Sequence, residues 1–140
     1  MANFTIADIK TLREQLGTGM VDTKKALEEA DGDLEKAVEI LRLKGAKGNA
    51  KRADRSTSEG LVTAVAHGDK VTILELNTET DFVAKNERFI ALADKVLEAA
   101  AAVDADSVEA ALAAPAGNQT VAELISDEAA IIGEKVELRR

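Results

Sequence analysis

Four adjacent residues, Thr80-Asp81-Phe82-Val83, place a carboxylate next to a large aromatic ring. The aliphatic run that ends at Leu76 indicates a strand before them, and apolar residues spaced three and four apart from Phe89 onward indicate a helix after them. The pair would then lie on an exposed elbow, which is unusual because an exposed ring gains nothing from water. The plainer interpretation, which spacing alone favours, is that Asp81 caps the helix and Phe82 folds into the core.

The other residues with metal-binding or catalytic chemistry form no recognisable set. His67 has neither a second histidine nor a cysteine near it in the sequence. The chain has no Ser/His/Asp or Cys/His combination and no phosphate-binding glycine loop, so we expect no enzymatic activity, no cofactor and no bound metal. Four carboxylates near the elbow could hold a hard cation, although a carboxylate-rich surface is expected at this composition: Glu75, Glu79, Asp81 and Glu87.

Composition limits the classes of protein and partner. At 140 residues there is room for one medium domain or two small ones, and the absence of cysteine rules out disulfides and thiolate metal sites. No apolar run approaches the ~20 residues of a membrane helix, and the N-terminus lacks a secretion signal pattern. We therefore expect a cytoplasmic protein with no membrane contact.

Charge is divided unevenly along the chain. Residues 1–55 carry eleven Lys or Arg against ten Asp or Glu, whereas residues 56–140 carry seven against sixteen. This split predicts two units. An acidic second unit, together with only three Phe and no Trp or Tyr, argues against direct nucleic-acid binding.

Residues 1–45 are predicted to form a bundle of three short helices. Thr5 and Asp8 make a variant capping box, Gly17-Thr18-Gly19 ends the first helix, and the second runs from about Asp22 to Ala30. A third helix follows the break at residues 31–33. The side chains expected to face inward are Ile6, Ile9, Leu12 and Leu16 on the first helix, Ala26, Leu27 and Ala30 on the second, and Leu34, Ala37, Val38 and Leu41 on the third.

A basic connector joins the two predicted units. Residues 42–55 carry six Lys or Arg against one Asp, and Gly45 is expected to end the third helix. Basic runs in linkers are common and no aromatic residue accompanies this one, which favours a solvated linker over a phosphate-binding patch. We predict a linker over residues 46–57 that acts as a hinge.

Residues 58–140 are predicted to form a small antiparallel sheet packed against helices, which makes the chain an α+β protein. Two β-branched runs flank Gly68-Asp69 as a hairpin, and the last seven residues alternate as a strand that could join it. A short helix before Pro115 and a longer one from a Thr120-Val121-Ala122-Glu123 capping box to Gly133 lie between. A long amphipathic helix should cover the hairpin, with Phe89, Leu92, Ala93, Val96, Leu97 and Ala100 inward.

Two stretches resemble the bacterial elongation factor Ts family. The run Thr80-Asp81-Phe82-Val83-Ala84-Lys85-Asn86 is similar to the family signature residue for residue. A second set occurs in the order of the family: Arg13, Gly17, Gly19, Met20, Asp22, Lys24, Lys25, Ala26 and Leu27. The resemblance covers essentially the whole chain and implies a ubiquitin-associated-like fold for residues 1–45. Because the chain ends directly after a predicted strand, we expect it to be cut between elements, with a second related half following in the family.

The resemblance implies a guanine-nucleotide exchange factor for the GTPase elongation factor Tu in translation elongation. Phe82 would wedge between helices beside the partner's nucleotide pocket, and Asp81 would disturb the Mg²⁺ shell. Thr80 and Val83 would fix the shape of the elbow. The residues expected to face a helix of the partner's nucleotide-binding domain are Lys10, Arg13, Met20 and Lys24.

Alternatives stay open at this stage. Met20, at a predicted loop tip, fits ordinary core packing as well as a contact role. The first unit alone could be a non-catalytic adaptor for ubiquitin-like or nascent-chain ligands, with the acidic unit as a spacer. The chain could also bind elongation factor Tu but exchange nucleotide poorly without a second half.

Overall fold

Several helix boundaries lie at the capping residues that the sequence predicts. The computed structural model describes residues 3–140, in which Thr5 forms a reciprocal capping box with Asp8, and Thr120 forms one with Glu123. Gly17 ends the first helix in the left-handed conformation, with φ of 68°. Hydrogen bonds that span three or four residues therefore fix these boundaries.

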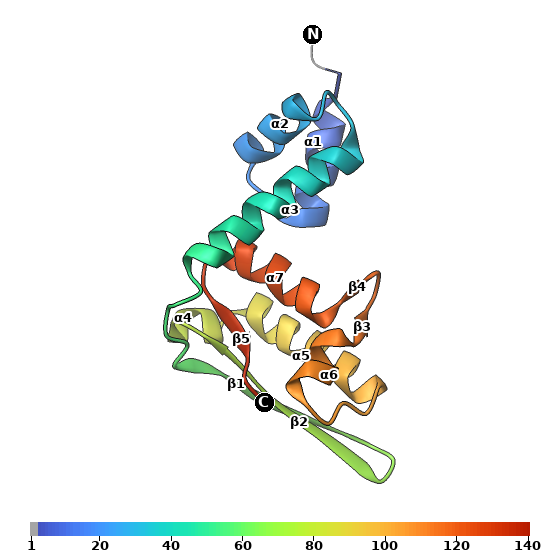
Figure 1. Ribbon diagram of the computed structural model, residues 1–140, viewed down its shortest axis with the longest axis vertical. Helices are drawn as coiled ribbons and strands as arrows, with labels where there is room; N and C mark the ends of the chain where they lie inside the picture. Colours follow the sequence, from blue (N-terminus) through green and yellow to red (C-terminus); the bar gives the residue numbers. More distant parts are fainter. Residues whose placement is uncertain (1–2) are drawn as a thin grey trace.

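Seven helices and two antiparallel sheets make up residues 3–140, in an α+β arrangement (Figure 1). In chain order they are α1 (Ile6–Leu16), α2 (Met20–Glu29), α3 (Leu34–Lys51), β1 (Glu59–His67), β2 (Lys70–Thr78), α4 (Asp81–Ala84), α5 (Glu87–Ala102), α6 (Val108–Ala113), β3 (Pro115–Ala116), β4 (Gln119–Thr120), α7 (Val121–Ile132) and β5 (Val136–Leu138). None of these helices is both long and apolar enough to cross a membrane.

The first three helices pack around a small core of their own, at the top of Figure 1. Two residues predicted to face this core do not: Ile6 is 84% exposed and Leu34 is also exposed, because each is the first residue of its helix, where the bundle ends. α2 begins at Met20, two residues earlier than predicted. The buried members are Leu12, Ala26, Leu27, Ala30, Ala37 and Leu41, with Ile9, Leu16 and Val38 packed against them.

The prediction that the third helix ends at Gly45 is wrong, because α3 continues to Lys51. Its last turns pack on α7, where Asn49 Nδ2 donates hydrogen bonds to the Ser126 carbonyl at 2.9 Å and to its hydroxyl at 3.1 Å. Such contacts offset the ~1 kcal/mol that a glycine costs inside a helix. Residues 46–51, predicted as linker, are therefore helical, while the limits of the two domains stay a prediction.

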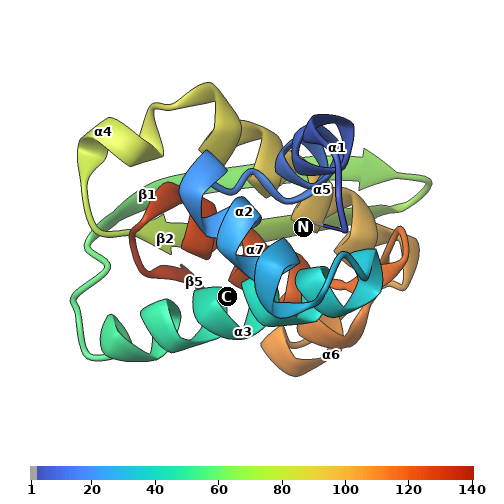
Figure 2. The same cartoon turned by 90° about the horizontal axis from the view of Figure 1, so that it is seen from above.

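The sheet forms as predicted. Gly68, with φ of 65°, takes the tight turn between β1 and β2, and β5 pairs antiparallel with the other edge of β2. Figures 1 and 2 show the hairpin turn projecting at one side of the molecule and α4 lying at the opposite side. The short β3 and β4 pair was not predicted and lies between α6 and α7.

The larger core lies between α5 and the inner face of the sheet. Leu74 and Leu76 of β2 are buried against it, whereas Val62, Val71 and Ile73 on the outer face of the hairpin are exposed. The inward face of α5 is the one that its apolar spacing predicts. All six predicted positions are buried: Phe89, Leu92, Ala93, Val96, Leu97 and Ala100.

Candidate functional site

The elbow, residues 80–83, is an exposed single turn of helix between β2 and α5. Thr80 is the N-cap of α4, and its hydroxyl accepts a hydrogen bond from the Val83 N–H at 3.4 Å. Asp81 is the first helical residue and faces Lys85 at 3.7 Å. Phe82 is 83% exposed. The interpretation in which Asp81 caps the helix and Phe82 enters the core is therefore wrong, and an exposed elbow is confirmed.

Helix geometry explains why neighbouring side chains of the elbow differ in burial. Successive side chains on an α-helix are turned by about 100°, so they cannot all face the same neighbour. Val83 is half-buried and packs against the larger core, which anchors the turn, while the ring of Phe82 points away into solvent. Phe89, seven residues further on, is fully buried under the sheet.

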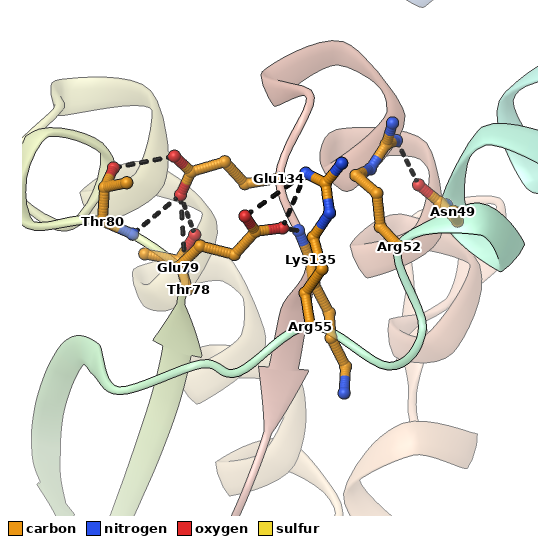
Figure 3. A network of polar contacts seen from close by, with 8 residues as sticks. All are labelled: Asn49, Arg52, Arg55, Thr78, Glu79, Thr80, Glu134 and Lys135. Carbon is orange, nitrogen blue, oxygen red and sulfur yellow. Dashed lines mark hydrogen bonds and ion pairs between the residues drawn. The ribbon is translucent and has the colours of Figure 1, made fainter.

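The elbow is held from the far end of the chain by Glu134, the second residue after α7. One carboxylate oxygen, Oε1, accepts from the Thr78 hydroxyl at 2.9 Å and from the backbone N–H groups of Glu79 and Thr80 at 3.2 and 3.0 Å. The other, Oε2, accepts from the Thr80 hydroxyl at 2.7 Å. Figure 3 shows this side chain reaching across to the strand end just before the elbow.

Glu79 returns the contact. Its carboxylate accepts from the Lys135 backbone N–H at 2.8 Å and lies 3.4 Å from the Arg55 guanidinium (Figure 3). Residues 78–80 and 134–135 thus hold each other through a glutamate on either side. The ion pair between Glu79 and Arg55 also joins the segment after α3 to these residues.

The hydrogen bonds lower the pKa of Glu134 below its ordinary value. Burial on its own raises this pKa, but the hydroxyls of Thr80 and Thr78 and the backbone N–H groups of Thr80 and Glu79 together outweigh it. Glu134 is therefore held as a carboxylate, an acceptor for all four donors.

The four carboxylates considered for a hard cation do not meet. Within residues 3–140 there is no group of three His, Cys, Asp or Glu side chains arranged to hold a metal ion. Glu75 instead pairs with Arg139 and Arg140, at 3.7 and 3.1 Å. Asp81 keeps its carboxylate at the surface, 3.7 Å from the Lys85 ammonium.

The four N-terminal candidates lie on α1 and α2, away from the elbow along the long axis of Figure 1. Met20 is 58% exposed and is therefore not core filler. Lys10 and Lys24 form surface pairs with Glu14 and Glu28, at 3.8 and 3.9 Å.

Arg13 has a local structural contact in addition. Its Nε donates to the Thr18 carbonyl at 3.2 Å, and the Thr18 and Thr23 hydroxyls share a hydrogen bond of 2.7 Å. These bonds shape the loop that precedes Met20.

Sequence reasoning missed Glu134, which lies 54 residues from Thr80. The only available signal was a glutamate directly after Gly133, a predicted helix end, and before a predicted strand. This position places Glu134 just before a strand, but the sequence spacing does not show that its partner is Thr80.

Known proteins match this chain along its whole length. The family described as Elongation factor TS matches residues 79–140. The elongation factor Ts of Leifsonia xyli is 74% identical over 141 residues, and that of Clavibacter michiganensis 66% over 140; each alignment covers all of this chain and 51% of the relative. The factor of Mycolicibacterium smegmatis is 56% identical over 140 residues, with 50% of it covered. The resemblance stated from the residues is confirmed, and the chain spans about half the length of the curated relatives it matches.

Proposed function

From a chain that matches the N-terminal portion of elongation factors Ts, we propose a role in translation elongation, as an exchange factor that promotes GDP release from elongation factor Tu. The observation that carries this proposal is the exposed ring of Phe82 on a turn whose backbone is fixed from both sides. An exposed ring on a turn with a fixed backbone is suited to enter a partner, because little backbone freedom is lost on binding.

Exchange requires differential binding and no covalent chemistry. The factor must bind the nucleotide-free partner more tightly than the nucleotide-bound one. By linkage, nucleotide then weakens the binding of the factor to the partner by the same ratio. Burying the Phe82 ring could supply about 1.5 to 3 kcal/mol, and each 1.4 kcal/mol of differential binding is about tenfold in affinity. The proposed partner is thus a GTPase, and the proposed role is not that of an enzyme.

Asp81 has a separate part in the proposal. GDP in such a GTPase is held partly through Mg²⁺ that bridges phosphate and protein oxygens, so displacing the ion's ligands loosens both. An exposed carboxylate beside the ring would reach the ion shell as the ring enters. Thr80 and Val83 contribute by holding the turn, one as cap and the other as anchor.

The N-terminal helices would give a second attachment. We propose a ubiquitin-associated-like fold for them, in which Met20, Lys10, Arg13 and Lys24 contact the partner's nucleotide-binding domain. The exposed thioether of Met20 at the start of α2 supports this, since methionine adapts to irregular apolar surfaces. The proposed location is the cytoplasm, where translation takes place, without direct contact to nucleic acid or membrane.

The test is the release of a fluorescent GDP from elongation factor Tu, with and without the 140-residue chain. Phe82→Ala should reduce the stimulation at least tenfold, because it removes about 1.5 kcal/mol or more of differential binding. Asp81→Ala should also reduce it. As the control, Ile73→Ala removes another exposed apolar side chain, on the outer face of the hairpin, and should leave the stimulation unchanged. Full stimulation by both elbow variants would refute the wedge.

A plain binding module is the second candidate. Met20 and Val21 are adjacent and both exposed, which makes a small apolar surface on the first unit alone. An adaptor of this kind would lose its ligand on Met20→Ala and keep it on Phe82→Ala. Loss of both elongation factor Tu capture and nucleotide release in Phe82→Ala would exclude it.

A further inference from the structure

We propose that Glu134 is a positioning residue for the elbow, one that fixes the direction of Phe82 by orienting the hydroxyl of Thr80. The inference rests on the proposed function and names a residue outside the elbow on which it depends. Glu134 touches neither Asp81 nor Phe82 through a hydrogen bond, so its effect would pass through residues 78–80, which it does bond.

The first step concerns a single hydrogen atom. A threonine hydroxyl has one hydrogen to donate and lone pairs with which to accept. In Thr80 the hydrogen goes to Glu134 Oε2 at 2.7 Å, which leaves a lone pair for the Val83 N–H at 3.4 Å. Without the carboxylate the hydroxyl is free to rotate, and the cap of α4 competes with other partners.

The second step concerns the length of α4. A helix of four residues cannot hold itself together in water, because nucleation is costly and few hydrogen bonds repay it. Its shape must come from outside. Glu134 Oε1 supplies this by holding the backbone N–H groups of Glu79 and Thr80, the last two residues before the turn.

The chain offers a matched control in Glu75. This carboxylate also joins β2 to the end of the chain, through Arg139 and Arg140, and hydrogen bonds likewise hold it in the ionised form. It has no contact with Thr80. Glu75→Gln therefore removes a comparable tie between the same two segments and leaves the elbow untouched.

The experiment measures GDP release from elongation factor Tu over a range of factor concentrations. Glu134→Gln should lower the maximal release rate about fivefold to tenfold, as expected for loss of charge-assisted hydrogen bonds, with less effect on the concentration for half-maximal stimulation. Glu75→Gln should stay within about twofold of the unmodified chain. A Glu134→Gln chain whose release rate equals that of Glu75→Gln overturns the proposal.

A double-mutant cycle separates positioning from a general loss of stability. Thr80→Ser keeps the hydroxyl and should retain the maximal rate, whereas Thr80→Val should lower it about as much as Glu134→Gln does. Combined with Thr80→Val, Glu134→Gln should lower the rate less than it does in the unmodified chain, because both changes remove the bond between these two side chains. Strictly additive losses would mean that Glu134 acts elsewhere.

A readout on the free chain keeps the inference separate from the proposed function. Hydrogen exchange of the Val83, Ala84 and Lys85 amides, whose bonds form α4, should speed up in Glu134→Gln and not in Glu75→Gln. If the unmodified chain fails to stimulate GDP release while amide exchange still differs between the two variants, the proposed exchange function is wrong and the positioning role of Glu134 is right. Equal amide exchange in both variants refutes the positioning.

Discussion

Gly45 of α3 lies against Ala130 of α7 so closely that a Cβ at position 45 would stand 2.9 Å from the Ala130 Cβ. Carbon atoms do not approach to that distance without displacement, so the two helices cross at the glycine. This contact, with the Asn49 bonds to Ser126, fixes the N-terminal helices on the second unit.

The crossing predicts a reversed sign for a common stabilising change. Replacing a helical glycine by alanine ordinarily stabilises by about 0.5 to 1 kcal/mol. Gly48→Ala, three residues along the same helix, should do so, because the new Cβ would meet only the guanidinium of Arg52, at a contact distance of 3.4 Å. Gly45→Ala should instead lower the free energy of unfolding by about 1 to 3 kcal/mol. Urea unfolding of the two variants decides; stabilisation by both would contradict the close crossing.

The two phenylalanines on either side of residue 85 should differ sharply in their share of stability. Phe89→Ala empties a fully buried site and should cost about 3 to 5 kcal/mol. Phe82→Ala removes the same atoms from solvent and should change the unfolding free energy by no more than about 0.5 kcal/mol. Denaturant midpoints measure both. A large loss in Phe82→Ala would place its ring in the core.

The exposed methionine of α2 should affect binding more than release. Met20→Ala is expected to raise the concentration of factor needed for half-maximal GDP release about fivefold, because burial of the exposed thioether against the partner would contribute about 1 kcal/mol or more to binding. The maximal rate should stay unchanged. Leu43→Ala, at a similarly exposed position of α3, is the control. A fall in maximal rate with Met20→Ala would assign that side chain to the release step itself.

Asp127, on α7, should respond to pH in the direction opposite to Glu75. Burial raises the pKa of Asp127, with Glu123 and Glu128 adding to it, although Arg42 lies 3.7 Å away and opposes the rise. A raised pKa in the folded state means that folding favours the protonated acid, and this contribution is lost as pH rises. Asp127→Asn should therefore not destabilise at pH 7, despite the lost ion pair.

Glu75 gives the contrast. Its pKa is lowered, above all by the hydrogen bond from Asn77 and against the effect of burial, with Arg140 and Arg139 contributing. Its contribution is present above the ordinary glutamate pKa and lost as pH falls, so Glu75→Gln should destabilise at pH 7 and less so near about pH 3.5. Urea midpoints of the unmodified chain and of both variants at the two pH values measure how each substitution's effect on stability changes with pH. A change of the same sign for Asp127→Asn and Glu75→Gln would contradict the assignment.

Much of the local architecture could be predicted because its causes are local. The capping boxes at Thr5 and Thr120 and the turn at Gly68 depend on bonds or dihedral angles within a few residues. The buried stripe of α5 follows from its apolar spacing alone. The same spacing was misleading for Ile6 and Leu34, since a stripe does not say where the neighbouring helix ends.

The sequence by itself determined the kinds and order of the longer elements, the position of the elbow and its likeness to one family, because periodicity, caps and motifs depend on residues close together in the chain. Only the tertiary structure decided that α3 runs on through Gly45, and that Glu134 holds Thr80 across 54 residues. Both depend on which surfaces meet. Gly45 is tolerated inside a helix, and Glu134 bonds a distant turn, because of neighbours that only folding brings into contact with them.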